Sequence, residues 1–186
     1  IALNNRGVVL KDLQRFDEAL AAFDAALALR PGFAEAHCNR GNVLRELGRN
    51  EEALASYDRA LALRPDYPEA LMNRGNALGD LGRHAEALAS LEQSLALKPD
   101  YAEAHSNLGI LLKLRGRLND AIASFQKALQ YKPDFVEAHN GLGGSFMEQS
   151  RLDEAVASFS KALSLQPDHA VTYSNLLFLH AYRAAL

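Results

Sequence analysis

The chain has 186 residues, enough for a sizeable core, and its 20 Lys and Arg against 23 Asp and Glu leave a formal net charge of −3. This near balance argues against a general nucleic-acid binder or a protein of anionic membrane surfaces. The single cysteine, Cys38, excludes an intrachain disulfide, and no apolar run reaches the ~18 residues of a membrane span. We therefore expect no membrane association and a reducing, cytoplasmic location.

One stretch of 34 residues, from Ala34 to Tyr67, recurs along the chain. Further copies start at residues 68, 102 and 136, a truncated copy occupies residues 1–33, and half a copy starts at Ala170. Four positions keep step, 34 residues apart. They are Pro31, Pro65, Pro99, Pro133 and Pro167; Gly7, Gly41, Gly75, Gly109 and Gly143; Ala19, Ala53, Ala87, Ala121 and Ala155; and Phe23, Tyr57, Leu91, Phe125 and Phe159.

Each copy is expected to form two helices. Apolar and small residues recur at intervals of three and four between residues 34 and 47 and again between residues 51 and 63. Gly48 follows the first run, where a left-handed residue commonly ends a helix, and Pro65 stops the second run.

The small residues Gly41 and Ala53 should let the two helices of a pair approach closely. A larger residue at either place would overpack the contact at a cost of about 1–3 kcal/mol. Tyr57 and its equivalents should fill the space between one pair and the next. Because no pair buries its apolar face alone, the pairs are expected to stack into an array.

A 34-residue period with Gly, then Ala-x3-Phe, then Pro is the pattern of the tetratricopeptide repeat. The chain resembles this family over essentially its whole length, although the family's usual Trp is absent. Its place holds Leu3, His37, Leu71, His105, His139 and Tyr173. The resemblance implies an all-α fold, a right-handed superhelical solenoid of antiparallel helix pairs.

The chain is then a single array over residues 1–186. Its repeats span residues 1–33, 34–67, 68–101, 102–135 and 136–169, and a C-terminal helix spans residues 170–186. Because Ile1 falls early in a repeat, we expect the chain to be an excerpt of a longer protein.

Several repeats depart from the common pattern. Gln14 and Ser150 stand where the other copies have the glycine of the turn between paired helices. The first helix of repeat five contains Gly141, Gly143 and Gly144, and each costs roughly 0.5–1 kcal/mol against alanine. This helix is therefore predicted to be the softest in the array.

The final segment departs most, because Leu177 replaces the small glycine and residues 176–179 are all apolar. Apolar groups then point all round the helix, whereas a terminal capping helix would have a polar outer face. Residues 170–186 are therefore expected to be covered, either by chain beyond Leu186 or by a second copy in a homodimer. The plainer alternative is that a few leucines are simply exposed.

Asparagine recurs on the first helices, where it is a poor mid-helix residue and therefore needs an explanation. One hypothesis is a ladder whose amides pair with the N–H and C=O groups of an extended peptide. The alternative is that the asparagines bond between adjacent repeats and only fix the stacking. The predicted peptide-binding residues are Asn5, Asn39, Asn42, Asn73, Asn76, Asn107, Asn140, Asn175, Arg45 and Lys113.

Two other recurrences are given a plainer interpretation. Arginine stands at each turn between paired helices, with a carboxylate three residues later, which indicates an exposed ion pair more than a phosphate-binding row. His37, His105 and His139 share one repeat position, but stacked helices would hold them about 10 Å apart, too far for one Zn²⁺. Cys38 is expected to be a small residue of the groove wall. No metal, cofactor or catalytic motif is predicted, so the chain itself is expected not to be an enzyme.

Within the repeat family, two features narrow the resemblance. They are the asparagine-bearing copies such as AEAHSNLGILLKLRGRLNDAIASFQKALQYKPDF and the ending TYSNLLFLHAY. Together they resemble the repeat region of O-linked N-acetylglucosamine transferases and their bacterial homologues. That resemblance implies a groove lined by Asn5, Asn39, Asn73, Asn107 and Asn175 that receives protein substrates, and it fails at Gly141.

The repeats that dock chaperone C-termini fit less well. Their clamp uses a lysine one place before the ladder asparagine, and no copy here has one. We therefore predict a scaffold that binds extended segments of other proteins in a concave groove. The two alternatives are the substrate-recruiting region of a glycosyltransferase and a structural, homodimerising module.

Overall fold

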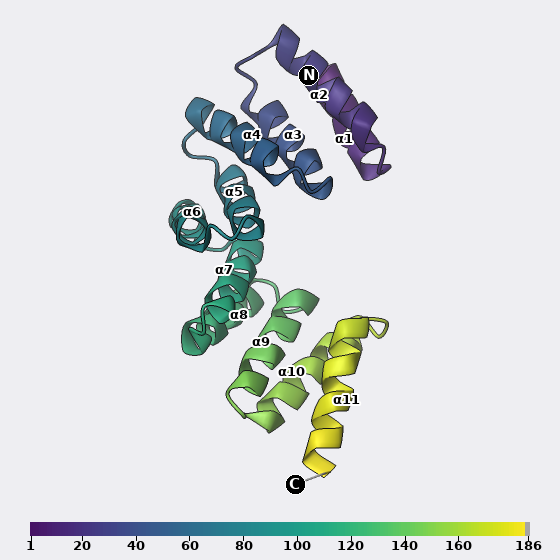
Figure 1. Ribbon diagram of the computed structural model, residues 1–186, viewed down its shortest axis with the longest axis vertical. Coiled ribbons are helices and arrows are strands. Elements are labelled where there is room, and N and C mark those ends of the chain that lie inside the picture. The colour runs from purple at the N-terminus through teal and green to yellow at the C-terminus, as the bar shows by residue number, and fades with distance from the viewer. Residues whose placement is uncertain (185–186) are drawn as a thin grey trace. The chain divides into compact units, whose positions relative to one another are not determined.

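The computed structural model describes the backbone of residues 1–184 and the side chains of residues 1–181. Over this part of the chain it consists of eleven α-helices without strands (Figure 1). The helices are α1 Ala2–Asp12, α2 Phe16–Leu29, α3 Ala34–Glu46, α4 Asn50–Leu63, α5 Pro68–Asp80, α6 His84–Leu97, α7 Ala102–Leu114, α8 Leu118–Tyr131, α9 Val136–Glu148, α10 Leu152–Leu165 and α11 Ala170–Ala184. The predicted all-α fold of helix pairs is confirmed, with five pairs and one further helix.

Helix ends lie where the sequence pattern put them. The turn glycines Gly48, Gly82 and Gly116 have φ between 71° and 73°, the left-handed region in which glycine carries no Cβ penalty. Gln14 and Ser150, which replace this glycine, adopt the same conformation with φ of 57° and 60°. The turn geometry is therefore kept in all five repeats, and in two of them a side chain bears the strain.

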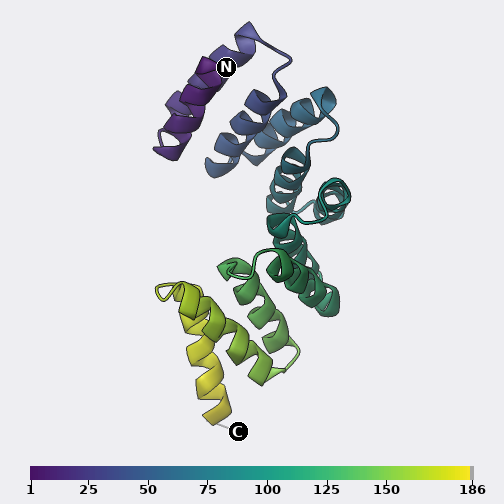
Figure 2. The same cartoon turned by 180° about the vertical axis from the view of Figure 1, so that it is seen from behind.

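The helices form two compact units, Ile1–Lys98 and Pro99–Leu186, which we call the N-terminal and C-terminal units. The N-terminal unit holds the pairs α1/α2, α3/α4 and α5/α6, and α2 packs on α3 as α4 packs on α5. The C-terminal unit holds α7/α8 and α9/α10, with α11 packed on α10 (Figure 2). The expectation that residues 1–186 form one array stays a prediction.

In each helix pair, an aromatic ring or a leucine of the second helix packs against a glycine of the first helix. A Cβ added to Gly41 would lie 2.6 Å from Tyr57 Cε1, and one added to Gly75 would lie 2.9 Å from Leu91 Cγ. Tyr57 is fully buried in this position. Its ring thus lies against the glycine of its own repeat, in a core cluster that also holds Ala70 and Ala77 of the next repeat.

Helix α9 shows why repeat five is rich in glycine. A Cβ at Gly143 would lie 2.8 Å from the Phe159 ring of its own repeat, and one at Gly141 would lie 2.4 Å from the Phe125 ring of the preceding repeat. Phe125 therefore reaches both its own repeat and the next. The Phe125 ring thus fills the space in which a side chain at position 141 would begin.

Candidate functional site

One stripe of each first helix is formed by positions 2, 6, 9 and 13 of the repeat. These positions are spaced by four, three and four residues, so they lie on a single helical face. We call it the first-helix stripe. It comprises Glu35, Asn39, Asn42 and Glu46 on α3; Glu69, Asn73, Asn76 and Asp80 on α5; Glu103, Asn107, Ile110 and Leu114 on α7; and Glu137, Gly141, Gly144 and Glu148 on α9. Except for the buried Gly144, these residues are half-buried or exposed, unlike the core residues beside them.

In the N-terminal unit, stripe asparagines bond from one repeat to the next. The Asn39 Nδ2 amide donates to Asn4 Oδ1 at 3.2 Å, and Asn73 Nδ2 donates to Asn42 Oδ1 at 2.9 Å. The buried Tyr57 hydroxyl also donates to Asn42 Oδ1, at 2.8 Å. An amide offers two donors and an acceptor, so Asn39 keeps one N–H and its carbonyl oxygen for another partner. Asn73 Nδ2 also contacts Cys38 Sγ at 4.0 Å, so Asn73 keeps its carbonyl oxygen.

In the C-terminal unit, the asparagines differ among themselves. Asn107 is half-buried, and its side chain makes no hydrogen bond to any residue that the structure describes. Asn140 accepts from Thr172 Oγ1 at 2.9 Å, which ties α9 to α11. The whole amide of Asn107 therefore remains available to a ligand.

The side chains of the remaining predicted asparagines make no such bonds to described residues. Asn5 is exposed, while Asn76 and Asn175 are half-buried. The structure brings Asn42 and Asn73 together and pairs Asn39 with Asn4, a residue outside the predicted set.

Both predicted cationic site residues form ion pairs with the next repeat. Arg45 Nε lies 3.7 Å from Asp80 Oδ2, and Lys113 Nζ lies 3.3 Å from Glu148 Oε1. Each cation is about two-thirds buried, with side-chain exposures of 32% and 30%. These pairs neutralise the charge that the two cations would otherwise offer to an acidic peptide.

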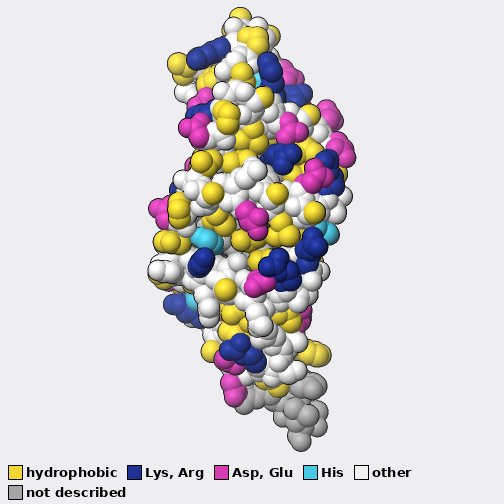
Figure 3. Space-filling view, turned by 90° about the vertical axis from the view of Figure 1, so that its left-hand side faces the viewer, with side chains coloured by type: hydrophobic (Ala, Val, Ile, Leu, Met, Phe, Trp, Pro, Cys, Tyr) yellow, Lys and Arg dark blue, Asp and Glu magenta, His cyan; other side chains and the backbone are white. Residues whose placement is uncertain are grey.

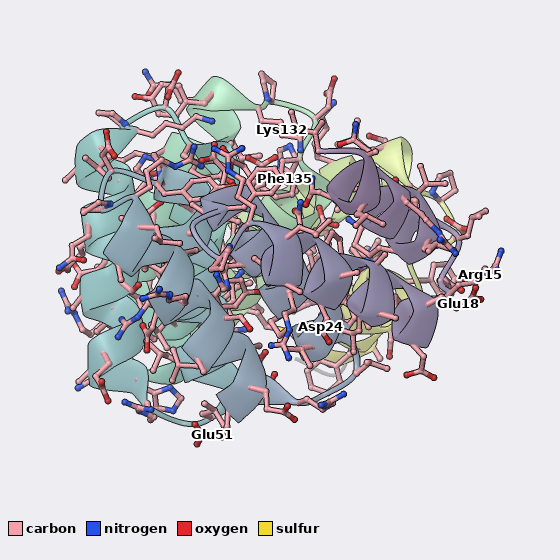
Figure 4. All side chains as sticks on the ribbon, turned by 90° about the horizontal axis from the view of Figure 1, so that it is seen from above. Arg15, Glu18, Asp24, Glu51, Lys132 and Phe135 are labelled. Carbon is pink, nitrogen blue, oxygen red and sulfur yellow. The ribbon has the colours of Figure 1, made fainter. Side chains whose placement is uncertain are left out.

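A second cluster lies at the loops that follow the second helices α4 and α8. Arg64 donates to Glu35 Oε1 at 2.8 Å and lies 3.4 Å over the Tyr67 ring. Lys132 in the same way lies 2.9 Å from Glu103 Oε1 and 4.3 Å over the Phe135 ring (Figure 4). These contacts hold the loop against the start of the first helix, and they use the carboxylate at position 2 of the stripe.

The arginine at each turn forms the predicted ion pair with the carboxylate three residues later. Arg49 and Glu52 make two parallel bonds of 2.7 Å, and Arg15 and Glu18 lie side by side in the same way (Figure 4). The Arg49 guanidinium holds the pKa of the Glu52 carboxyl below its ordinary value. Arg15 and Arg49 thus already use their Nε and one terminal nitrogen within the turn.

The histidines at the shared repeat position form hydrogen bonds to the loops that precede their helices. Nε2 of His37, His105 and His139 lies 2.8–2.9 Å from the carbonyl oxygen of the proline six residues earlier. His105 is buried, stacks on Tyr131 at 5.8 Å, and has Nδ1 buried without a partner among the described residues. Burial lowers the pKa of His105. No group of three or more potential metal ligands occurs in the described part of the chain.

Cys38 is not a residue of the groove wall, which corrects the expectation from the sequence. It is only 2% exposed and lies beneath Asn73, whose Nδ2 is 4.0 Å from its Sγ. Burial raises the pKa of the Cys38 thiol, so it is a poor nucleophile. Its small size suits the space between α3 and α5.

A further set of contacts between repeats was not predicted from the sequence. Arg40 Nε bonds Asp24 Oδ1 at 2.7 Å, and Arg74 Nε bonds Asp58 Oδ1 at 2.6 Å. In each case the aspartate lies on the second helix of the preceding repeat. The signal was available, because an aspartate stands 16 residues before each arginine. In the C-terminal unit the arginine becomes Leu142, which is buried, and the aspartate becomes Gln126.

On the face drawn in Figure 3, the side chains of Lys and Arg are interspersed with those of Asp and Glu. Among the described residues, no helix has both the length and the apolar character needed to cross a membrane.

Comparison with known protein families identifies the repeat. Models described as tetratricopeptide repeat match residues 1–33, 22–55, 69–134 and 115–170, and one described as TPR repeat matches residues 41–82. These models describe the repeat alone and give no link to glycosyltransferases. No curated protein matches the chain.

Several solved structures share the fold. TTC0263, a thermophilic TPR protein in Thermus thermophilus, has a TM-score of 0.81 at 28% identity, covering 97% of this chain and 98% of its own. YrrB, described as a TPR protein with an unusual peptide-binding site, has a TM-score of 0.71 at 26% identity, covering 98% and 91%. MamA has a TM-score of 0.75 at 27% identity, covering 88% and 96%.

Proposed function

Because this chain is built of tetratricopeptide repeats, we propose that it is a non-catalytic scaffold that binds extended segments of other proteins along its first-helix stripes. The partner's backbone pairs with the stripe amides, so binding depends on an extended conformation more than on one particular sequence. The net charge of −3 and the interspersed surface charges favour a protein partner over a nucleic acid. Cys38, a free thiol, suits a reducing compartment.

The observation that carries this proposal is the half-buried Asn107, whose amide has no partner in the described part of the chain. A polar side chain in the middle of a helix costs helix stability unless it bonds something. Asn39 and Asn73 keep unused bonding capacity on the same stripe of the N-terminal unit. The likeness to YrrB, whose description names a peptide-binding site, supports the same class of ligand.

The test is capture of peptides on an immobilised array of random 12-residue sequences. We expect Asn107→Ala to weaken capture several-fold, since each lost peptide hydrogen bond is worth about 1 kcal/mol. Adding Asn39→Ala and Asn73→Ala should weaken it further. Gln130→Ala, on the exposed face of the second helix α8, is the control and should leave capture unchanged.

The opposite result would assign the asparagines to stacking. It would consist of a clear loss of stability in the triple variant while the folded protein captures the same peptides with the same strength. A wild-type chain that captures no peptide on the array would overturn the proposal as a whole.

Recruitment of protein substrates to a glycosyltransferase is a narrower version of this function, and it rests only on the sequence resemblance. It predicts that the chain alone transfers no sugar, and that deleting it from its parent protein impairs protein glycosylation. Unimpaired transfer to proteins by the deleted parent would reject it.

Homodimerisation through residues 170–186 is the structural alternative, although residues 185 and 186 lie outside the described part. Leu177 and Phe178 on α11 are 53% and 62% exposed, which supports a covering partner. Sedimentation equilibrium should then give a mass that rises with concentration and returns to the monomer in Leu177→Ser. A monomer mass at all concentrations would exclude the dimer.

A further inference from the structure

The first-helix stripe of α7 differs from its counterparts in the N-terminal unit. Positions 9 and 13 hold Asn42 and Glu46 on α3 but Ile110 and Leu114 on α7. Ile110 is 44% exposed and Leu114 is 68% exposed, although their neighbours Leu111 and Leu112 are almost completely buried. Two apolar side chains thus lie outside the core at the places where α3 carries an amide and a carboxylate.

These two side chains form one surface with Asn107. Residues four apart on a helix have Cβ atoms about 5–6 Å from each other, so Ile110 and Leu114 are in contact range. Asn107 lies three residues before Ile110 on the same stripe, and its amide is unused among the described residues. A peptide backbone bonded to Asn107 would therefore place a neighbouring side chain over Ile110 and Leu114.

The two charged residues of α7 that flank this surface, Glu103 and Lys113, are each paired within the C-terminal unit. Glu103, at the start of the α7 stripe, bonds Lys132 at 2.9 Å, and Lys113 bonds Glu148 of α9 at 3.3 Å. Beside it, α9 contributes Gly144, where an added Cβ would meet only the flexible end of Lys113. The apolar pair is thus flanked by charges that already have partners and lies beside a glycine of α9.

We propose that Asn107, Ile110 and Leu114 form an anchor site that selects extended peptides with a large aliphatic or aromatic side chain. Asn107 holds the backbone, and Ile110 with Leu114 removes the apolar side chain from water. This inference rests on the proposed function and adds the chemical class of the segment that is bound. A single exposed leucine would not justify it, because such residues are common on protein surfaces. The evidence is that the apolar pair, the unbonded Asn107 amide and the paired Glu103 and Lys113 occur together on one helix.

The experiment uses the full chain and a matched set of 12-residue peptides. Each peptide is built of Ser, Thr and Gln, and the members differ only at one central position, which is Leu, Asn, Glu or Lys. Fluorescence anisotropy measures the dissociation constant of each. We expect the Leu peptide to bind at least about tenfold more tightly than the Asn peptide, the size of effect that burying one leucine produces.

The decisive variant is Ile110→Asn with Leu114→Glu, which installs the residues that α3 carries at the same places. Because α3 forms a helix with Asn and Glu at these two places, the variant should fold. Its helical content and melting temperature check that it does. The tenfold preference for Leu should disappear in the variant. Leu29→Asn removes a leucine that is 80% exposed on α2, and it should leave the preference unchanged.

Four results would overturn the inference, and they have different consequences for the proposed function. If all four peptides bind equally, or if the double variant keeps the preference, the anchor site is wrong while the proposed function stands. If the wild-type chain binds none of these peptides or of the random array, the proposed function falls with it. If the double variant instead abolishes a concentration-dependent dimer of the free chain, the surface is an interface between copies.

Discussion

At the scale of single residues, one side-chain type does two different jobs. Asn73 donates to Asn42 across a repeat boundary, whereas Asn107 at the same repeat position has no partner in the described part of the chain. The stacking hypothesis and the ligand hypothesis thus apply to different asparagines. Alanine variants of the two kinds of asparagine should therefore differ in their free energy of unfolding.

Asn73→Ala should lower the free energy of unfolding by about 1 kcal/mol, because a partly buried hydrogen bond between repeats is lost. Asn107→Ala should leave it unchanged or raise it by a few tenths of a kcal/mol, because alanine is the better helix former. Urea denaturation of both variants measures the difference. Asn76→Ala, which loses no bond to a described residue, is the control and should behave like Asn107→Ala.

Ser150 bears a backbone strain that can be removed. With φ of 60°, it occupies the conformation that Gly48, Gly82 and Gly116 adopt in their repeats. Ser150→Gly should raise the free energy of unfolding by about 1 kcal/mol, because the left-handed conformation penalises a Cβ. Ser150→Ala keeps the Cβ and should give no such gain. Thermal melts of the wild type and both variants measure the difference. A stabilised alanine variant would contradict this explanation.

His105 should make stability depend on pH. Its Nε2 donates to the Pro99 carbonyl, so a second proton would go to Nδ1, which is buried without an acceptor in the described structure. Burial lowers the folded-state pKa below the ordinary 6.5, so the unfolded chain takes up the proton first. The contribution of neutral His105 to the free energy of unfolding is therefore complete above pH 6.5, and it is lost as the pH falls toward the folded-state pKa.

The measurement is urea denaturation between pH 7.5 and pH 5, on the wild type and on His105→Gln. The wild type should lose stability over this range, and the variant should lose less. Equal losses in the two proteins would show that His105 is not the group responsible.

At the scale of elements, glycine has different meanings within a single helix. On α5, a Cβ at Gly75 would lie 2.9 Å from Leu91 Cγ and 3.3 Å from the Ala87 carbonyl oxygen, whereas one at Gly79 would meet nothing within 4 Å. The first glycine permits close helix packing, and the second only weakens the helix.

Gly75→Ala should therefore lower the free energy of unfolding by about 1–3 kcal/mol through overpacking. Gly79→Ala should raise it by about 0.5–1 kcal/mol through helix propensity. Both substitutions add the same methyl group to the same helix, so each is the control for the other in chemical denaturation. Changes of the same sign would contradict the assignment.

The glycines of α9 follow the same logic. Gly141 lies against the Phe125 ring and Gly143 against the Phe159 ring. Alanine at either place would improve helix propensity, but its methyl group would clash with the ring. The prediction that α9 is the softest helix remains open. Hydrogen exchange of its amides, compared with those of α7 in the same unit, would measure it.

At the scale of the whole molecule, electrostatics contributes little to stability. The ion pairs described above, within turns and between repeats, each have at least one solvent-exposed partner. Pairs of this kind are typically worth about 0–1 kcal/mol and are screened by salt. We expect the melting temperature to change by no more than a few degrees between 0.05 and 0.5 M NaCl. A larger fall would show that the ion pairs between repeats hold the array together.

The sequence by itself determined the helices, their ends and their pairing. The spacing of Gly, Ala and Pro is a local signal, because helix periodicity, the left-handed turn and the arrest at proline each depend on a few neighbouring residues. The helices predicted over residues 34–47 and 51–63 are accordingly α3, Ala34–Glu46, and α4, Asn50–Leu63.

Only the tertiary structure decided which stripe residues remain available to a ligand. Asn39, Asn73 and Asn107 are equivalent in sequence, but their bonding depends on side chains about 30 or more residues away, such as Asn4 and Asn42. In the same way Cys38 is buried beneath Asn73 of the next repeat and is not on the groove wall. A repeat pattern specifies what one unit is, whereas the contacts between units depend on both neighbours and appear only when they are packed together.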